Sequence, residues 1–251
     1  MTADVADDRT NGTLHRKIVL AAADVLEREG LDALSTRAVA ARAGVFPPTI
    51  FRLFGDKDGL LEAVGEHGFE TYLQAKSRLP QSDDPVADLR LAWDLHVEFG
   101  LVQPAYYVLV FGQSRSGHLS RAGRKAVAEL QRMITRVAAV GRLRMSVERA
   151  TAIMHAAGVG VVSTMISTPP EFRDLETASV TREVVFDAIT APPGAEPVGT
   201  ATGAGPAGPA GPAMALRTVL AEEGELPLSP GEKLLLLELL NRLADVQTGT
   251  G

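Results

Sequence analysis

The chain lacks the common sequence patterns in which side chains carry out covalent or metal chemistry. It has no cysteine, which excludes disulfides, thiolate metal sites and thiol nucleophiles. His96 and His155 have no carboxylate or second histidine nearby at the spacing of metal ligands. The sequence contains no nucleophile elbow, no phosphate-binding P-loop and no dinucleotide-binding glycine motif. We therefore expect no enzyme activity, no metal and no cofactor.

The distribution of charge limits how the chain can meet nucleic acid. Its formal net charge is −6 at pH 7. Residues 9–78 hold ten Lys and Arg side chains against nine Asp and Glu, so this segment is close to neutral, while the rest is acidic. Because a general basic field is missing, DNA could be bound only through individually placed basic residues.

The first part of the chain carries the pattern of a helix-turn-helix. Apolar residues recur at helical spacing up to Gly30, and Ser35 can cap a second helix that Gly44 closes. A fourth helix begins after Asp56. The predicted helices cover residues 14–29, 36–43, 48–54 and 57–79. Short helices with a glycine turn between the second and the third are typical of a helix-turn-helix.

A proline pair stands at the entrance of the third predicted helix. Pro47 and Pro48 each lack a backbone N–H. At the first helical position this costs little, because that N–H would have no intrahelical partner. The pair does remove the option of binding a phosphate through those N–H groups.

The rest of the chain also has a helical pattern. Residues 84–190 show no convincing strand alternation and are interrupted at Gln103-Pro104, Ser116-Gly117, Gly141 and Thr168-Pro169-Pro170. Residues 191–213 consist mainly of alanine, glycine and proline, which indicates a semi-extended linker. Short amphipathic pieces follow, and the second begins with Ser229-Pro230-Gly231-Glu232, a capping box.

We therefore expect an all-α protein with an N-terminal three-helix helix-turn-helix domain, a helical bundle and a tethered C-terminal helix. The expected organisation is a disordered tail over 1–12, the helix-turn-helix over 13–58 with the fourth helix continuing to about 79, the bundle over 80–190, the linker over 191–213 and accessory helices over 214–251. No uncharged apolar run reaches the roughly 18 residues of a membrane span, so we expect a soluble protein with no membrane partner.

One block of the sequence carries a family resemblance. It comprises Leu20-Ala21-Ala22-Ala23 through Glu29-Gly30, Val39-Ala40-Ala41-Arg42-Ala43-Gly44-Val45, Thr49-Ile50-Phe51-Arg52-Leu53-Phe54 and Lys57-Asp58-Gly59-Leu60-Leu61. In order and spacing, the block resembles the DNA-binding domain of the TetR family of bacterial transcriptional regulators. The resemblance implies a cytoplasmic protein that binds double-stranded DNA with its third helix in the major groove. The DNA-binding residues it implies are Ser35, Arg37, Phe46, Pro47, Pro48, Thr49, Phe51, Arg52 and Lys57.

The chain departs from the family at the head of the third helix, where most members have a serine cap followed by small or basic residues. Phe46, Pro47 and Pro48 instead present apolar surface suited to thymine methyl groups, with no hydrogen-bond reading of the base. Phe51 stands where the family usually has a tyrosine, so a hydrogen bond to phosphate is missing. We expect these differences to shift the base preference and to leave the fold intact.

The resemblance also implies an effector cavity and a dimer interface within residues 80–190. For a small apolar or amphipathic effector the candidates are Trp93, His96, Tyr106, Tyr107, Phe111 and Met133, and the alternative is that each simply fills the core. The apolar segment from Ala150 to Val162 is rich in small residues and by resemblance forms a homodimer interface with residues 172–190. The candidate interface residues are Ile153, Met154, Ala157, Val161 and Met165.

The sequence is compatible with two functions. The leading hypothesis is a repressor that binds a palindromic operator as a homodimer and is released by a small-molecule effector. The alternative is a DNA-binding regulator without a small ligand, controlled by a protein partner or by the C-terminal tail.

Overall fold

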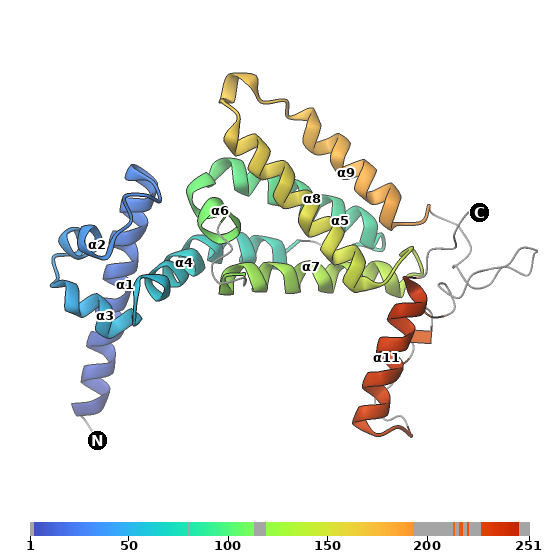
Figure 1. Ribbon diagram of the computed structural model, residues 1–251, viewed down its shortest axis with the longest axis horizontal. Helices are drawn as coiled ribbons and strands as arrows, with labels where there is room; N and C mark the ends of the chain where they lie inside the picture. The colour runs from blue at the N-terminus through green and yellow to red at the C-terminus, as the bar shows by residue number, and fades with distance from the viewer. Residues whose placement is uncertain are drawn as a thin grey trace, which may run out of the picture. The chain divides into compact units, whose positions relative to one another are not determined.

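The computed structural model describes residues 3–79, 81–112, 119–192, 213, 216–217, 220 and 227–245, with only the backbone for residues 3–10. Over these residues the chain is all-α, as the sequence predicts (Figure 1). The helices are α1 (Ala3–Glu29), α2 (Thr36–Ala43), α3 (Pro47–Phe54), α4 (Lys57–Ser77), α5 (Pro85–Val102), α6 (Pro104–Phe111), α7 (Arg121–Ala139), α8 (Val147–Ser167), the 3-10 helix η1 (Pro170–Phe172), α9 (Glu176–Ile189) and α11 (Pro230–Ala244).

The chain divides into two compact units. The first comprises Met1–Arg78 and Glu98–Ala126, and the second comprises Leu79–Val97 and Val127–Gly251. The end of α5, all of α6 and the start of α7 therefore belong to the unit that holds the predicted helix-turn-helix. The sequence predicts a simpler division near residue 79.

The N-terminus differs from the expected tail. The sequence predicts disorder over residues 1–12, whereas α1 begins at Ala3 and is helical from there. Few apolar residues precede Leu14, so apolar periodicity gave no signal for this part of the helix. The predicted linker falls largely on residues 193–212, which lie outside the described residues, as does most of the first accessory piece.

The first unit is held together by apolar residues that α1 to α4 contribute to one core. Ile18, Leu26, Val39, Ile50 and Val64 are all fully buried there. The turn between α2 and α3 requires a left-handed residue, and Gly44 supplies it with φ 63°. The N–H of the next residue, Val45, then donates to the carbonyl of Ala40 at 3.0 Å, which closes α2.

The second unit packs α8 beside α9 and buries Trp93, Ile134, Val162 and Phe186 (Figure 1). Leu143 and Thr190 form an isolated antiparallel bridge that joins the loop before α8 to the end of α9. Among the described helices, α8 alone is long and apolar enough to cross a membrane, a test that the core helix of a globular protein also passes.

The C-terminal helix α11 begins with the predicted capping box. Ser229 Oγ accepts from the N–H of Glu232 at 3.3 Å, and the Glu232 carboxylate accepts from the N–H of Ser229 at 2.8 Å. At the other end, Asp245 accepts hydrogen bonds from Ser146, the N-cap of α8, at 2.8 and 3.1 Å. Leu240 and Ala244 are buried. Other leucines of α11 are exposed: Leu234, Leu235, Leu239 and Leu243.

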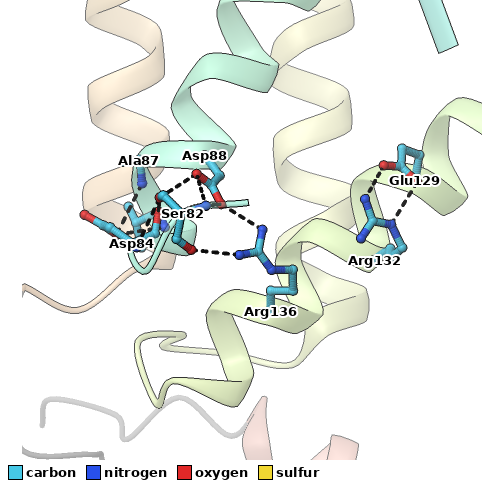
Figure 2. A network of polar contacts seen from close by, with 8 residues as sticks. Ser82, Asp84, Ala87, Asp88, Glu129, Arg132 and Arg136 are labelled. Carbon is cyan, nitrogen blue, oxygen red and sulfur yellow. Dashed lines mark hydrogen bonds and ion pairs between the residues drawn. The ribbon is translucent and has the colours of Figure 1, made fainter. Parts of the chain in front are cut away.

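A buried carboxylate organises the start of α5 in the second unit (Figure 2). Asp88 is 2% exposed and accepts from Ser82 Oγ at 2.7 Å and from Arg136 Nη1 at 2.7 Å. Arg136 also donates to the carbonyl of Ser82 at 3.0 Å. Burial raises the pKa of Asp88, but the hydrogen bonds from Ser82 and Arg136 and the positive charge of Arg136 outweigh it, so the pKa lies below its ordinary value.

This network predicts a pH-dependent contribution to stability. Because the folded-state pKa of Asp88 is lowered, its contribution is present above the unfolded pKa of about 4 and is lost as pH falls through the folded pKa. Asp88→Asn should lower the free energy of unfolding by about 1–3 kcal/mol near pH 7, and the difference from the wild type should shrink below about pH 4. Urea unfolding between pH 3 and pH 7 measures both.

The matched control is Asp83→Asn, which removes the same charge from an exposed position in the loop before α5. This variant should change stability little at any pH. Equal effects of the two substitutions would contradict the assigned role of Asp88.

Candidate nucleic-acid interface

Helix α3 buries one side and exposes the other. Ile50 is fully buried, and Phe54 is half-buried with its ring stacked on His15 at a centroid distance of 4.4 Å. On the outer side, Phe46 is 82% exposed and Phe51 is 50% exposed. The apolar side chains on one side of this 8-residue helix thus attach it to the core of the first unit, and its remaining side chains face solvent.

The N-terminus of α3 offers no backbone donor in its first turn. Pro47 and Pro48 have no N–H, and the N–H of Thr49 donates to the carbonyl of Phe46 at 2.9 Å. Phe46 is the N-cap residue and makes no side-chain capping bond. A ligand at this helix end would therefore have to be bound by side chains, because the usual anion site of a helix N-terminus is absent.

The basic residues predicted to bind DNA lie on helices of the first unit. Arg37 is exposed in the first turn of α2, and Lys57 is exposed at the first position of α4. Arg52 is exposed on α3, and its Nη1 donates to Asn11 Oδ1 of α1 at 3.1 Å. The guanidinium of Arg52 is thus oriented by α1 while it remains accessible.

Ser35 has a defined structural role in this structure. It is the N-cap of α2, and its Oγ accepts from the N–H of Ala38 at 3.1 Å. Asp56 caps α4 in the same way, accepting from the N–H of Gly59 at 2.7 Å. These caps set the starting points of the helices that present Arg37 and Lys57.

Sequence reasoning missed two residues that position this surface. Arg42 of α2 forms ion pairs with Asp24 and Glu29 of α1, the latter at 2.8 Å. Asn11 was assigned to the tail and instead contacts Arg52. Arg42 belongs to the block that resembles the TetR family. The acidic residues of the first predicted helix could have indicated its ion pairs. No pattern pointed to Asn11.

The predicted effector residues are divided between the two units. Trp93, His96 and Met133 belong to the second unit, and a carbon placed at the Cβ position of Gly158 would lie 3.4 Å from His96 and 3.8 Å from Trp93. Trp93 is 2% exposed, and its indole Nε1 has no hydrogen-bond partner within the described part of the chain. The first unit holds the others: Tyr106, Tyr107 and Phe111.

In the first unit the aromatic residues pack tightly against α1 and α4. Phe111 lies 5.4 Å from Phe69 and 5.0 Å from Tyr107, measured between ring centroids. The hydroxyl of Tyr106 donates to Glu27 Oε1 at 2.8 Å, which links α6 to α1. Burial raises the pKa of Tyr106, and the bond to Glu27 raises it further.

The predicted dimer residues lie on different sides of α8. Met154, Val161 and Met165 are buried within the second unit, while Ile153 and Ala157 are half-buried. The exposed side of α8 carries small residues at helical spacing: Ala152, Ala156, Gly160, Ser163 and Thr164.

Comparison with known proteins identifies the first helices. The sequence model of the family described as bacterial regulatory proteins, tetR family, matches residues 18–64. These helices belong to the TetR family. The match covers the second part of α1, all of α2 and α3 and the head of α4, so the TetR-type head contains every residue singled out above for DNA contact. No curated protein matches the chain.

Solved structures share the fold. A TetR-family transcriptional regulator from Streptomyces coelicolor is 24% identical, with 68% of this chain and 95% of that chain covered at a TM-score of 0.52. A protein of unknown function from Rhodococcus sp. RHA1 is 22% identical, with 71% and 95% covered and a TM-score of 0.59. A TetR-family transcriptional regulator from Haemophilus influenzae RD is 19% identical, with 72% and 99% covered and a TM-score of 0.53. The chain therefore has the fold of TetR-family regulators.

The close packing of α6 on α4 predicts the effect of adding a methyl group. A Cβ at Gly68 of α4 would lie 2.0 Å from the ring of Tyr106, whose hydroxyl is held by Glu27. Gly68→Ala should lower the free energy of unfolding by about 1–3 kcal/mol in urea titrations, because the buried ring must shift.

Gly12→Ala is the control, since a Cβ at Gly12 of α1 meets nothing within 4 Å. It should leave stability unchanged or raise it by up to about 1 kcal/mol through helix propensity. Equal stability of the two variants would show that α6 is not packed on α4 as described.

Proposed function

We propose that the chain is a transcriptional regulator that binds a palindromic operator as a homodimer and is released from it by a small-molecule effector. The observation that carries the proposal is the outward-facing α3 within a TetR-type head, with Arg37 and Lys57 exposed on the adjoining helices. In a helix-turn-helix this helix enters the major groove. Basic side chains beside it would fix its register through phosphate contacts.

The charge of the head fits sequence-specific binding better than general binding to DNA. With nearly balanced charge over residues 9–78, few phosphates can be neutralised, and affinity must come from contacts along α3. Thr49 and Arg52 supply the polar side chains of that helix. We therefore expect a shallow salt dependence together with clear base preference.

The exposed surface of α8 and α9 supports a homodimer. The small residues on the outer side of α8 would let a second helix approach closely, and a Cβ at Gly160 meets nothing within 4 Å. On the neighbouring α9, Val184 is 65% exposed and Val180 is also exposed. A self-complementary contact through this face would place two heads around a two-fold axis, which matches a palindrome.

The support for a small-molecule effector is the buried indole of Trp93. A buried N–H without a partner costs about 1–3 kcal/mol, and a ligand with a hydrogen-bond acceptor would remove that cost. An effector that binds one conformation better than another shifts the balance between them, and it can change DNA affinity by at most its own difference in binding free energy. The hydroxyl of Tyr106, bonded to Glu27 of α1, connects α6 to the TetR-type head within the first unit.

A second candidate is control by a protein partner in place of an effector. The exposed leucines of α11, of which Leu234 is 71% exposed, favour it, because such side chains often mark a contact surface. In either case we propose a cytoplasmic DNA-binding protein with no enzyme activity and no membrane partner.

Selection of random duplex DNA by the purified protein tests the DNA function directly. We expect an enriched palindrome whose affinity falls with salt. Lys57→Ala should weaken binding to all sequences alike and make the slope of log K against log salt concentration shallower by about one. Lys233→Ala, the same charge change on α11, is the control and should leave both unchanged. If Lys57→Ala also leaves them unchanged, Lys57 does not contact DNA.

The dimer is tested by placing a charge on its proposed face. Val184→Glu should convert the dimer to monomers in sedimentation equilibrium, because a carboxylate would be buried without a partner. Val140→Glu, at an exposed position after α7, is the matched control and should remain dimeric. A dimer that survives Val184→Glu would show that the two chains meet elsewhere.

A further inference from the structure

The head of α3 combines an exposed aromatic ring with a lack of hydrogen-bonding groups. Phe46 is the most exposed large apolar side chain among the described residues. Its neighbours Pro47 and Pro48 are also exposed. None of these side chains has a polar atom, and the prolines have no N–H. This surface can therefore contact a partner only through apolar groups.

The backbone holds this apolar surface in one arrangement. Phe46 is extended, with φ −79° and ψ 141°, as expected for a residue before proline. Its carbonyl accepts the N–H of Thr49 at 2.9 Å, which joins it to the first turn of α3. Because the backbone would lose few conformations when a partner binds, little conformational entropy would oppose the binding free energy of an apolar contact here.

Only one kind of apolar group is presented on base edges in the major groove. Thymine carries a methyl group at C5, and the other unmodified bases present hydrogen-bond donors and acceptors there. Methylation of cytosine at C5 places a methyl group at the equivalent position. We propose that Phe46 and Pro47 read the C5-methyl group of a pyrimidine, either thymine or 5-methylcytosine, at the operator position that faces the head of α3.

The inference rests on the proposed DNA function and names the base chemistry that this head selects. Polar readout then falls to the next turn, where Thr49 and Arg52 follow on α3. The two kinds of contact should therefore be separable by position along the operator, with the methyl-dependent position nearest the N-terminus of the helix.

Replacing thymine by uracil removes only the methyl group and is the direct test. In the enriched operator, each thymine is replaced in turn and the dissociation constant is measured with the full-length protein. At the position facing Phe46, in either half-site of the palindrome, uracil should weaken binding about fourfold, the factor expected when one methyl-sized group is no longer buried. Uracil elsewhere should have no effect. At the same position, a cytosine pair should bind more tightly when methylated at C5 than when unmethylated.

Variants of the two exposed phenylalanines assign the effect to a residue. In Phe46→Ala the uracil substitution should no longer matter, because the ring that contacts the methyl group is gone. Phe51→Ala, which removes another exposed ring from α3, should keep the uracil effect. Phe46 is exposed, so its loss should leave the circular dichroism spectrum and the unfolding midpoint unchanged.

The outcomes separate this inference from the proposed function. Sequence-specific binding in which no thymine-to-uracil change matters, or in which the effect persists in Phe46→Ala, would overturn the methyl readout and leave the DNA function standing. A Phe46→Ala protein that binds the thymine-containing operator as tightly as the wild type would also overturn it. Failure to enrich any sequence would contradict both proposals.

Discussion

The burial of Ile50 is the constraint on which the candidate interface depends. In a helix of 8 residues, one fully buried side chain fixes the rotation of the helix about its axis. Half-buried Leu53 and Phe54 follow at the third and fourth positions after it and lie toward the same side. Phe51 and Arg52 must then face outward, while Phe46 precedes the helix as its extended N-cap residue and is exposed there. The core of the first unit therefore decides which side chains the helix presents, and surface chemistry has little part in that choice.

Helix α1 contacts each of the elements that position this interface. It packs against α3, pairs with Arg42 of α2, orients Arg52 through Asn11 and accepts the hydroxyl of Tyr106 through Glu27. Each contact is modest by itself, since exposed ion pairs contribute roughly 0–1 kcal/mol. Because all of them end on one helix, a shift of α6 would be felt by α1 as well as by α4.

Local signals made much of the fold predictable. The cap at Ser35, the left-handed turn at Gly44 and the capping box at Ser229 depend on residues within a few positions, and each has the predicted geometry. Contacts between distant residues were not predictable in this way. Nothing near Asp88 indicates that Arg136 will reach it, and the aromatic residues between Trp93 and Phe111 are neighbours in sequence yet belong to different units. The start of α1 was missed because Asn11 contributes to a polar contact, while periodicity detects only apolar faces.

Photocrosslinking can show whether α3 is the element that enters the DNA groove. Thymines of a bound duplex would be replaced one at a time by 5-iodouracil, which crosslinks at the C5 position in the major groove, and the attached peptide would be identified by mass spectrometry. We expect attachment within residues 46–54. Crosslinks confined to peptides of the second unit, with none on α3, would contradict it.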